Sequence, residues 1–437
     1  MSYQGGCMIH RRRFAAVLVG VALIASACGS DDDKADSTTT AAAAATTAAP
    51  AATTAATTAA TTAATTAATT AETTGDSTAE TTEATEGTTE GSGATDDPGL
   101  AAAKAVVEQY RDPNQPIGVT IPLTGKPEKH TIAWLECELE SCPYITVGMK
   151  AATEALGWDL QVISSKSADP GPAMQQAIDA GVDFIASSGE APALYEEQAK
   201  AAKDKGIKIL SCFDTTVPDP ENSNIYTQCG DATFVEKTGP LMADWAIVDS
   251  DGAANVLVVN IPDFAVLVSE VDAYKAEMEK NCEKCTVTEL NVTIDDLVGG
   301  KVPAAVASQL QSNPDINYVF NSFGSLPGGM TAALDSAGLL DQVTVYGQDF
   351  SGFDLEEIVA GTMGAWSADP KAYAGWLMVD AAARLSLGMD LTEERSSAAL
   401  PTYLVEDAAA AQAILDEDGG DWSPPTMADD FKKLWGV

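Results

Sequence analysis

Short apolar runs and amphipathic stretches alternate along most of the chain that follows Pro127. Apolar runs of this length are typical of strands in a parallel sheet, because helices cover both faces of such a sheet. The predicted strands are residues 131–135, 160–164, 182–186, 207–210, 255–259, 286–290, 318–321 and 343–347. The predicted helices lie between them, at 146–156, 173–180, 193–205, 269–279, 303–311, 330–337 and 355–360.

This alternation predicts an α/β fold made of two doubly wound lobes, each with its own parallel sheet. Gly157, Gly181 and Gly206 follow the three helices of the first series, at the position where a left-handed residue commonly ends a helix. A single closed barrel of eight strand–helix units is the alternative architecture.

The first 28 residues have the layout of an export signal. Three arginines at 11–13 precede the apolar stretch 14–24, which is too short to span a bilayer comfortably. The small residues 25–27 and then Cys28 resemble the lipobox of bacterial lipoproteins, although Ala25 stands where Leu is usual. The resemblance implies a signal peptide at 1–27, acylation of Cys28 and anchoring at the outer face of the cell membrane. An ordinary cleavable signal is the alternative.

Residues 28–98 are predicted to form a disordered tether. From Ser37 to Pro98 the chain is mostly Ala and Thr and contains no Leu, Ile, Val, Phe, Tyr or Trp. Such a segment cannot bury enough apolar surface to offset its backbone entropy. The folded part is therefore expected at 99–437.

The net charge of −40 argues against nucleic-acid binding, which requires a basic surface. Only His10 and His130 are present, so a histidine-based zinc site is disfavoured, and we expect neither a metal nor a cofactor. Six cysteines lie beyond the signal and suggest disulfides outside the cytosol. Pairing of nearest neighbours is the favoured of fifteen connectivities: Cys137 with Cys142, Cys212 with Cys229, and Cys282 with Cys285.

Four passages resemble, in order, segments of the type I periplasmic binding proteins, close to the ribose-binding group. They are the PYI motif with its following helix (143–157), AGVDFI (180–185), GIKI leading to Phe213-Asp214 (206–214), and VYGQD (345–349). The resemblance implies two lobes joined by three crossings, near Gly230, Ala368 and Pro401. Lobe one would then comprise about 130–230 and 368–400, and lobe two about 231–367 and 401–437.

The strand ends supply the candidate ligand-binding residues, since open α/β sheets bind ligands beyond the carboxyl ends of their strands. Asp214 and Asp349 are the polar candidates, one in each lobe, and the alternative role of each is to cap a helix. Tyr144, Phe213 and Phe264 could stack on a ring, with packing in the core or hinge as the alternative. The side chain of Trp134, in the middle of a predicted strand, could point toward the ligand or away from it.

Compared with sugar binders of this group, the chain has Val268 and Phe323 in place of an Arg and Asn clamp, and Ala368 near a common amide position. Phe323 joins the candidate set, and a flatter or less hydroxylated ligand is implied. Glu136, Glu138 and Glu140 could select an amine, but a solvated charge run is favoured. For Asp416–Asp421, an exposed acidic turn is favoured over a calcium loop.

No catalytic motif of the hydrolase, metalloprotease or P-loop type occurs. Together with this absence, the resemblance to the type I periplasmic binding proteins implies a non-enzymatic, monomeric binding protein that delivers a sugar, or a sugar-like or heterocyclic molecule, to an ABC permease and ATPase complex. A receptor presenting its ligand to a membrane sensor is the alternative, and a carbohydrate-active enzyme is a remote one.

Overall fold

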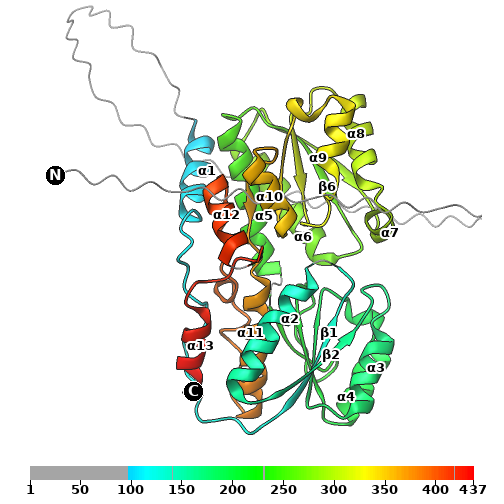
Figure 1. Ribbon diagram of the computed structural model, residues 1–437, viewed down its shortest axis with the longest axis vertical. Coiled ribbons are helices and arrows are strands. Elements are labelled where there is room, and N and C mark those ends of the chain that lie inside the picture. The colour runs from blue at the N-terminus through cyan, green and yellow to red at the C-terminus, as the bar shows by residue number, and fades with distance from the viewer. Residues whose placement is uncertain (1–96, 140, 230–231, 418) are drawn as a thin grey trace, which may run out of the picture. The chain divides into compact units, whose positions relative to one another are not determined.

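The computed structural model describes residues 97–437 except 140, 230, 231 and 418, all within one compact unit. The predicted signal, Cys28 and the tether up to residue 96 lie outside the described residues. The described chain forms two α/β lobes, lobe two above lobe one in Figure 1, each with its own sheet. The single closed barrel is therefore excluded.

Lobe one contains a five-stranded, fully parallel sheet in the order β2-β1-β3-β4-β5. Its strands are β1 (Thr131–Glu136), β2 (Asp159–Ser164), β3 (Phe184–Ser188), β4 (Lys208–Cys212) and β5 (Ile225–Cys229). Side chains of α2 (Cys142–Leu156) and α11 (Lys371–Ser386) pack on one face of this sheet. Side chains of α3 (Gly171–Ala180) and α4 (Glu196–Asp204) pack on the other, so both faces are covered.

Lobe two contains a six-stranded sheet in the order β11-β10-β9-β8-β6-β7, in which only β11 is antiparallel. Its strands are β6 (Asn255–Asn260), β7 (Thr286–Asn291), β8 (Tyr318–Asn321), β9 (Thr344–Gln348), β10 (Trp366–Ser367) and β11 (Leu404–Val405). One face packs on α1 (Pro98–Gln109), α5 (Ala232–Asp249) and α6 (Ala265–Asn281). The other packs on α8 (Val302–Ser312), α9 (Met330–Ala337), α10 (Gly352–Ala360) and α12 (Ala408–Glu417), with the short α7 (Ile294–Val298) beside them.

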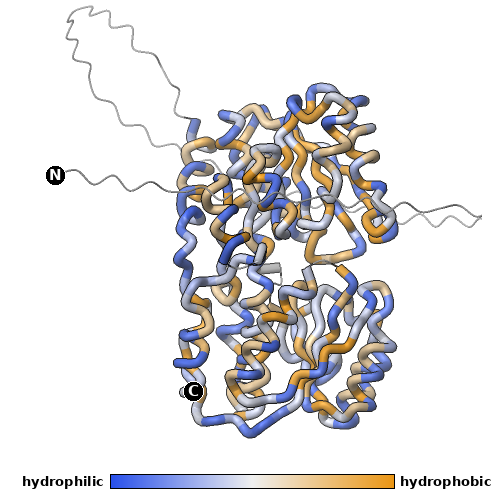
Figure 2. The backbone as a smooth tube through the Cα atoms, in the orientation of Figure 1, coloured by the Kyte–Doolittle hydropathy of each residue, from blue (hydrophilic) through white to orange (hydrophobic). Residues whose placement is uncertain are grey.

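All eight predicted strands exist, within two residues at each end. Gly157, Gly181 and Gly206 have φ of 70°, 71° and 76°, so each provides the left-handed residue that ends its helix. Figure 2 shows how hydrophobic and hydrophilic stretches alternate along the chain in both lobes. This alternation is the signal from which the strands and the intervening helices were predicted.

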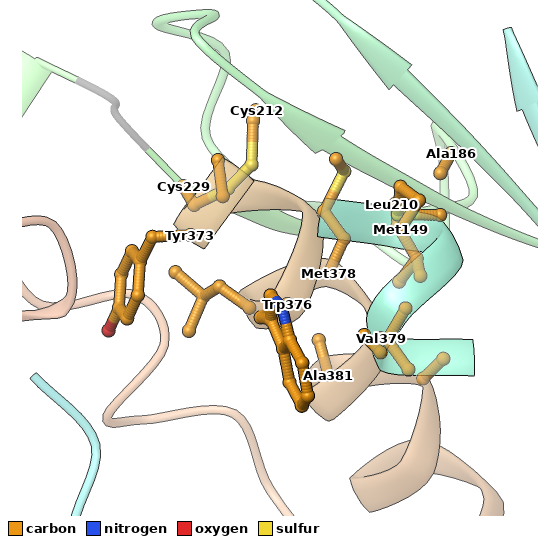
Figure 3. Close-up of a cluster of buried hydrophobic side chains, with 14 of the residues drawn as sticks. Met149, Ala186, Leu210, Cys212, Cys229, Tyr373, Trp376, Met378, Val379 and Ala381 are labelled. Atoms are coloured by element: carbon orange, nitrogen blue, oxygen red, sulfur yellow. A yellow bond between two sulfur atoms is a disulfide. The ribbon is translucent and has the colours of Figure 1, made fainter. Parts of the chain in front are cut away.

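Several elements escaped that pattern, among them the helices α1, α5, α11 and α12, the last helix of the chain, and the strands β5, β10 and β11. Helix α11 is buried along nearly its whole length, so it shows no polar face from which a helical period could be recognised. Figure 3 shows why: Met378 lies toward Met149 of α2 and Leu210 of the sheet, whereas Trp376 points away from them, toward other parts of the core. Helix α5 contains Pro240 and packs against both α1 and α6, which hides its period in the same way.

The chain crosses from one lobe to the other between β5 and α5, at 368–371 and at 400–403. It also crosses at two further places. Before β1 it leaves α1 in lobe two and contributes Ile117 and Val119 to the core of lobe one. After α12 it returns to lobe one through residues 419–426 and ends in α13 (Met427–Trp435).

The predicted assignment of the whole tail, 401–437, to lobe two is therefore wrong for its last helix. Phe431 and Trp435 of α13 stack on Trp376 of α11, with ring centroids 5.7 and 5.3 Å apart. The Trp435 indole also donates a hydrogen bond of 2.7 Å to the buried carboxylate of Asp380. The apolar face of α13 thus completes the core of lobe one. Within the described part of the chain, no helix combines the length and apolarity needed to cross a membrane.

Candidate functional site

A cavity of about 80 Å³ lies between the lobes, at the carboxyl ends of the strands. Lobe one lines it with Cys137, Leu139, Ser141, Cys142, Ile145, Ser167, Ser188, Gly189 and Phe213. Lobe two lines it with Phe234, Val235, Phe264, Val266, Leu267, Phe323, Gln348 and Asp349, and the crossing into α11 adds Asp369 and Lys371. The two opposed sheet edges therefore share one site, as open α/β sheets do.

Phenylalanine rings form much of the wall. Phe213 directly follows β4 and has a φ of 57°, a left-handed conformation that is uncommon outside glycine and often found at functional sites. Its backbone N–H donates to the carbonyl of Cys229, and the Cys212–Cys229 disulfide joins the ends of β4 and β5 beside it. Figure 3 shows this pair of sulfurs above Tyr373 at the start of α11.

The wall from lobe two comes close to lobe one at Phe264, the residue before α6. A Cβ built on Gly189 would lie 3.9 Å from Cδ1 and Cε1 of the Phe264 ring. Gly189 has a φ of 79°, so glycine both permits the backbone turn after β3 and leaves space for the ring. Val266 and Leu267, in the first turn of α6, extend this apolar surface.

The polar end of the cavity is a buried cluster of charges around Lys371, the first residue of α11. Its ammonium donates to Oδ1 of Asp349, which directly follows β9, and lies 3.3 Å from the backbone carbonyl of Asp369. Both side chains of the ion pair are more than nine-tenths buried. The pair links the end of a lobe-two strand to a lobe-one helix.

The carboxylate of Asp421 caps the start of the same helix. Its two oxygens accept the N–H groups of Lys371 and Ala372, at 3.1 and 2.8 Å, and the Ser423 hydroxyl accepts that of Tyr373 at 3.2 Å. These bonds satisfy donors at the start of α11 that have no partner within the helix. The prediction of an exposed acidic turn at 416–421 is therefore wrong for Asp421, which is buried as a helix cap.

The carboxyl groups of this cluster hold protons more tightly than usual. Burial raises the pKa of Asp349 to about 6 although Lys371 opposes the shift, and burial raises the pKa of Asp421 to about 6 as well. The pKa of Asp369 is raised further by burial and by Asp349. Burial alone would lower the pKa of Lys371, but the three carboxylates together raise it, so Lys371 remains a cation.

Two more buried carboxyl groups lie next to the cavity. Glu270 of α6 is fully buried, neither of its oxygens has a hydrogen-bond partner among the described residues, and burial together with Asp369 and Asp349 raises its pKa. Glu190 of lobe one follows the lining residues Ser188 and Gly189. It accepts the Ser188 N–H at 2.8 Å, and burial raises its pKa to about 8.

The structure brings four of the six predicted ligand-binding residues together. Phe213, Phe264, Phe323 and Asp349 all line the cavity. The helix-cap alternative for Asp349 does not apply, because Ser351 and Asp354 form the capping box of α10.

The other two, Tyr144 and Asp214, are not among the lining residues. Tyr144 lies on α2 next to Ile145, whose side chain reaches the cavity, while the Tyr144 hydroxyl donates to the carbonyl of Gly419 at 3.3 Å. Asp214 is buried behind Phe213 and accepts the N–H of Thr216 at 3.3 Å, as in a local turn.

The remaining sequence candidates have structural roles. Trp134 is buried in lobe one, and its indole donates to Thr146 at 2.7 Å. Glu136 accepts from the same Thr146 hydroxyl, and Glu138 accepts the N–H of Ser167 at 3.0 Å. Glu140 lies outside the described residues. Val268 is exposed, and its neighbours Val266 and Leu267 line the cavity instead.

Lys371 and Asp369 are the residues that sequence reasoning missed. They directly follow the crossing predicted near Ala368, where any residue lies between the two lobes. The sequence signal that could have identified them is the pair of charged side chains on either side of Pro370, at a crossing between the lobes.

The cysteines form the three nearest-neighbour disulfides. Cys137–Cys142 closes a loop that lines the cavity, whereas Cys282–Cys285 follows α6 and is not part of the lining. Among the described residues, no three His, Cys, Asp or Glu side chains gather as a metal-binding group.

Known proteins share this architecture. Residues 143–389 match the model of the periplasmic binding protein domain. No curated protein matches the sequence significantly. Many solved structures share the fold at low sequence identity.

Three of these structures illustrate the likeness. The 5-methylthioribose transporter solute binding protein of Thermotoga lettingae, solved with 5-methylthioribose, is 20% identical with a TM-score of 0.57, covering 72% of this chain and 99% of its own. An ABC transporter solute binding protein of Agrobacterium vitis with bound allitol is 19% identical with a TM-score of 0.56, covering 66% and 99%. A sugar ABC transporter structure of Yersinia enterocolitica is 17% identical with a TM-score of 0.57, covering 73% and 99%.

Proposed function

Because the chain belongs to the periplasmic binding protein domain family, we propose that it captures a small molecule between its lobes and delivers it to an ABC importer. The observation that carries this proposal is the aromatic-lined cavity to which both lobes contribute. A ligand that contacts both lobes stabilises the closed arrangement, because closure adds contacts that the open form lacks. The protein carries out no chemistry on its ligand.

The proposed ligand is a sugar or a sugar-like or heterocyclic molecule. Phe213, Phe264 and Phe323 offer ring faces on which a flat or weakly hydroxylated body can stack. The solved relatives were crystallised with 5-methylthioribose and with allitol, and both are compatible with a fold that holds small polar molecules.

We propose that the protein acts outside the cytoplasm as a monomeric lipoprotein. Export and acylation at Cys28 would hold it at the outer face of the cell membrane, with residues 28–98 as the tether between the lipid and the folded domain. The three disulfides support an oxidising location. Loss of membrane association on Cys28→Ser, measured by cell fractionation, tests the anchor.

The binding function is tested by a thermal-shift screen of sugars, polyols, nucleosides and amines. A ligand bound only by the folded protein raises its Tm. Ser188→Trp, which fills the cavity from the end of β3, is expected to abolish that shift. Ser312→Trp, on an exposed helix end, is the matched control and is expected to retain it. An equal shift in both variants would contradict binding in this cavity.

Delivery to an importer is tested separately in cells. Deletion of the coding sequence is expected to abolish uptake of the labelled ligand, and wild-type protein to restore it. Restoration of uptake by Ser188→Trp would contradict the role of the cavity in transport.

A further inference from the structure

Resting on this binding function, we infer that the ligand carries a cationic group, a protonated amine or a quaternary ammonium, that contacts the acidic end of the cavity and its phenylalanine rings. The argument starts from the hydrogen-bonding groups in the lining. It then considers the balance of charge and the aromatic faces.

Three side-chain donors of the lining are used within the protein, whereas no bond from the hydroxyls of Ser141 and Ser188 is seen among the described residues. The Gln348 amide donates to the carbonyl of Ser322, the Ser167 hydroxyl lies 3.3 Å from Glu138, and the Lys371 ammonium contacts Asp349. Arg, Asn, His, Trp and Tyr do not occur among the described lining residues. A lining with few available donors favours a ligand that itself donates hydrogen bonds.

Acidic groups outnumber basic groups around the cavity. Asp349 and Asp369 line it, and Asp421 and Glu270 lie behind them, whereas Lys371 and Lys237 are the described cations of this cluster. Oδ1 of Asp369 is buried without a hydrogen-bond partner among the described residues. A buried carboxylate is stabilised by a nearby positive charge, which a cationic ligand would supply.

The apolar wall is also suited to a cation. The faces of aromatic rings carry partial negative charge and attract ammonium groups, above all where water is excluded. One ring already shows this arrangement: the ammonium of Lys237 lies 4.9 Å from the ring centroid of Phe234. Phe213, Phe264 and Phe323 surround the same space, and among the described residues no cationic side chain lies over their rings.

The inference is tested with pairs of probes that differ in charge. Choline is compared with its uncharged carbon isostere 3,3-dimethyl-1-butanol, and glucosamine with glucose, by isothermal titration calorimetry near neutral pH. The cationic member of at least one pair is expected to bind at least tenfold more tightly than its neutral counterpart. Equal binding, or tighter binding of the neutral members, would overturn the inference and leave the proposed function intact.

Two variants identify the groups responsible. Asp369→Asn is expected to reduce the preference for the cation strongly, and Phe264→Leu, which keeps an apolar side chain but removes the π face, to reduce it several-fold. Asp335→Asn makes the same change in net charge on the exposed side of α9 and is expected to leave the preference unchanged. Circular dichroism confirms that each variant is folded. A preference unaffected by both cavity variants would overturn the inference.

The ligand that copurifies with the protein gives an independent result. Its mass in native mass spectrometry is expected to identify a compound with a basic nitrogen. A compound without an ionisable nitrogen would overturn the inference while supporting the binding function. Failure of every probe and of every copurified small molecule to bind would contradict the binding function itself, and the inference with it.

Discussion

The ammonium of Lys371 contacts the carboxylate of Asp349, and this buried ion pair joins the first turn of α11 in lobe one to the end of β9 in lobe two. Both residues also line the cavity. The same contact therefore supports the lobe junction and forms part of the ligand site. A change at either residue is expected to affect both.

Lys371→Met is expected to destabilise the protein by about 3–5 kcal/mol, because it leaves buried carboxylates without their cation. The loss of Lys371 should raise the pKa of Asp349 beyond about 6. A carboxyl with a raised pKa stabilises the folded state at low pH, and that stability is lost as pH rises through the folded-state pKa. The deficit relative to wild type should therefore be larger at pH 8 than at pH 5.

Urea denaturation at the two pH values measures this deficit. Lys126→Met, which removes an exposed ammonium, is the control and is expected to change stability by less than about 0.5 kcal/mol. A deficit for Lys371→Met as small as that of the control would contradict the role assigned to the ion pair.

Glu190 gives a second pH-dependent prediction. Its pKa is raised from 4.5 to about 8 by burial, so its protonated form stabilises the fold below pH 4.5 and this contribution is lost as pH rises to about 8. Glu190→Gln stays neutral and keeps the acceptor for the Ser188 N–H. Its Tm is expected to exceed that of wild type by ~2 °C or more at pH 8.5, and by less at pH 5.

Differential scanning calorimetry at both pH values checks this difference. Glu197→Gln, at an exposed position of α4, should show no such pH-dependent gain. A constant difference between Glu190→Gln and wild type across this range would show that Glu190 does not titrate there.

Much of the lobe architecture could be predicted because it depends on local sequence. Continuous apolar runs such as Asn255–Asn260 identify buried strands, and glycines such as Gly157 mark the ends of helices. Part of the aromatic side of the site followed from the same pattern, since Phe213 and Phe264 come shortly after strands, whereas Phe323 followed from the family resemblance. These residues needed no knowledge of tertiary contacts.

What could not be predicted depends on contacts between distant segments. Lys371 meets Asp349 only because the chain crosses between the lobes, and Asp421 reaches α11 from 50 residues away. Trp435 packs on Trp376 although the family resemblance assigned the tail to the other lobe. Helix α11 lacks a polar face because both lobe-one strands and neighbouring helices cover it. Periodicity contains no information about such partners.

The last helix is expected to be essential for the stability of lobe one. Trp435→Ala removes the stacking on Trp376 and the hydrogen bond to Oδ1 of Asp380, for an expected loss of about 3–5 kcal/mol. Trp435→Phe keeps a ring but removes the indole N–H, and should cost about 1–2 kcal/mol. Chemical denaturation compares the two, and a negligible loss for Trp435→Ala would mean that α13 does not contribute to this core.

The disulfide that lines the cavity is expected to affect binding more than folding. Replacing both Cys137 and Cys142 by Ser frees the loop that carries Leu139 and Ser141, and ligand affinity should fall several-fold because the loop must be ordered on binding. Replacing both Cys282 and Cys285 by Ser is the matched control and should leave affinity unchanged. Calorimetric titration measures the ligand affinity of both double variants. Equal affinities of the two variants would contradict a role for this loop in the site.

The central claim is that one cavity, shared by the two lobes, holds a small molecule. Native mass spectrometry of the protein purified from the cell that produces it, compared with Ser188→Trp, tests this claim most directly. The account predicts a bound small molecule on the wild-type protein that is absent from Ser188→Trp and present on Ser312→Trp. The same bound mass on all three proteins would contradict it.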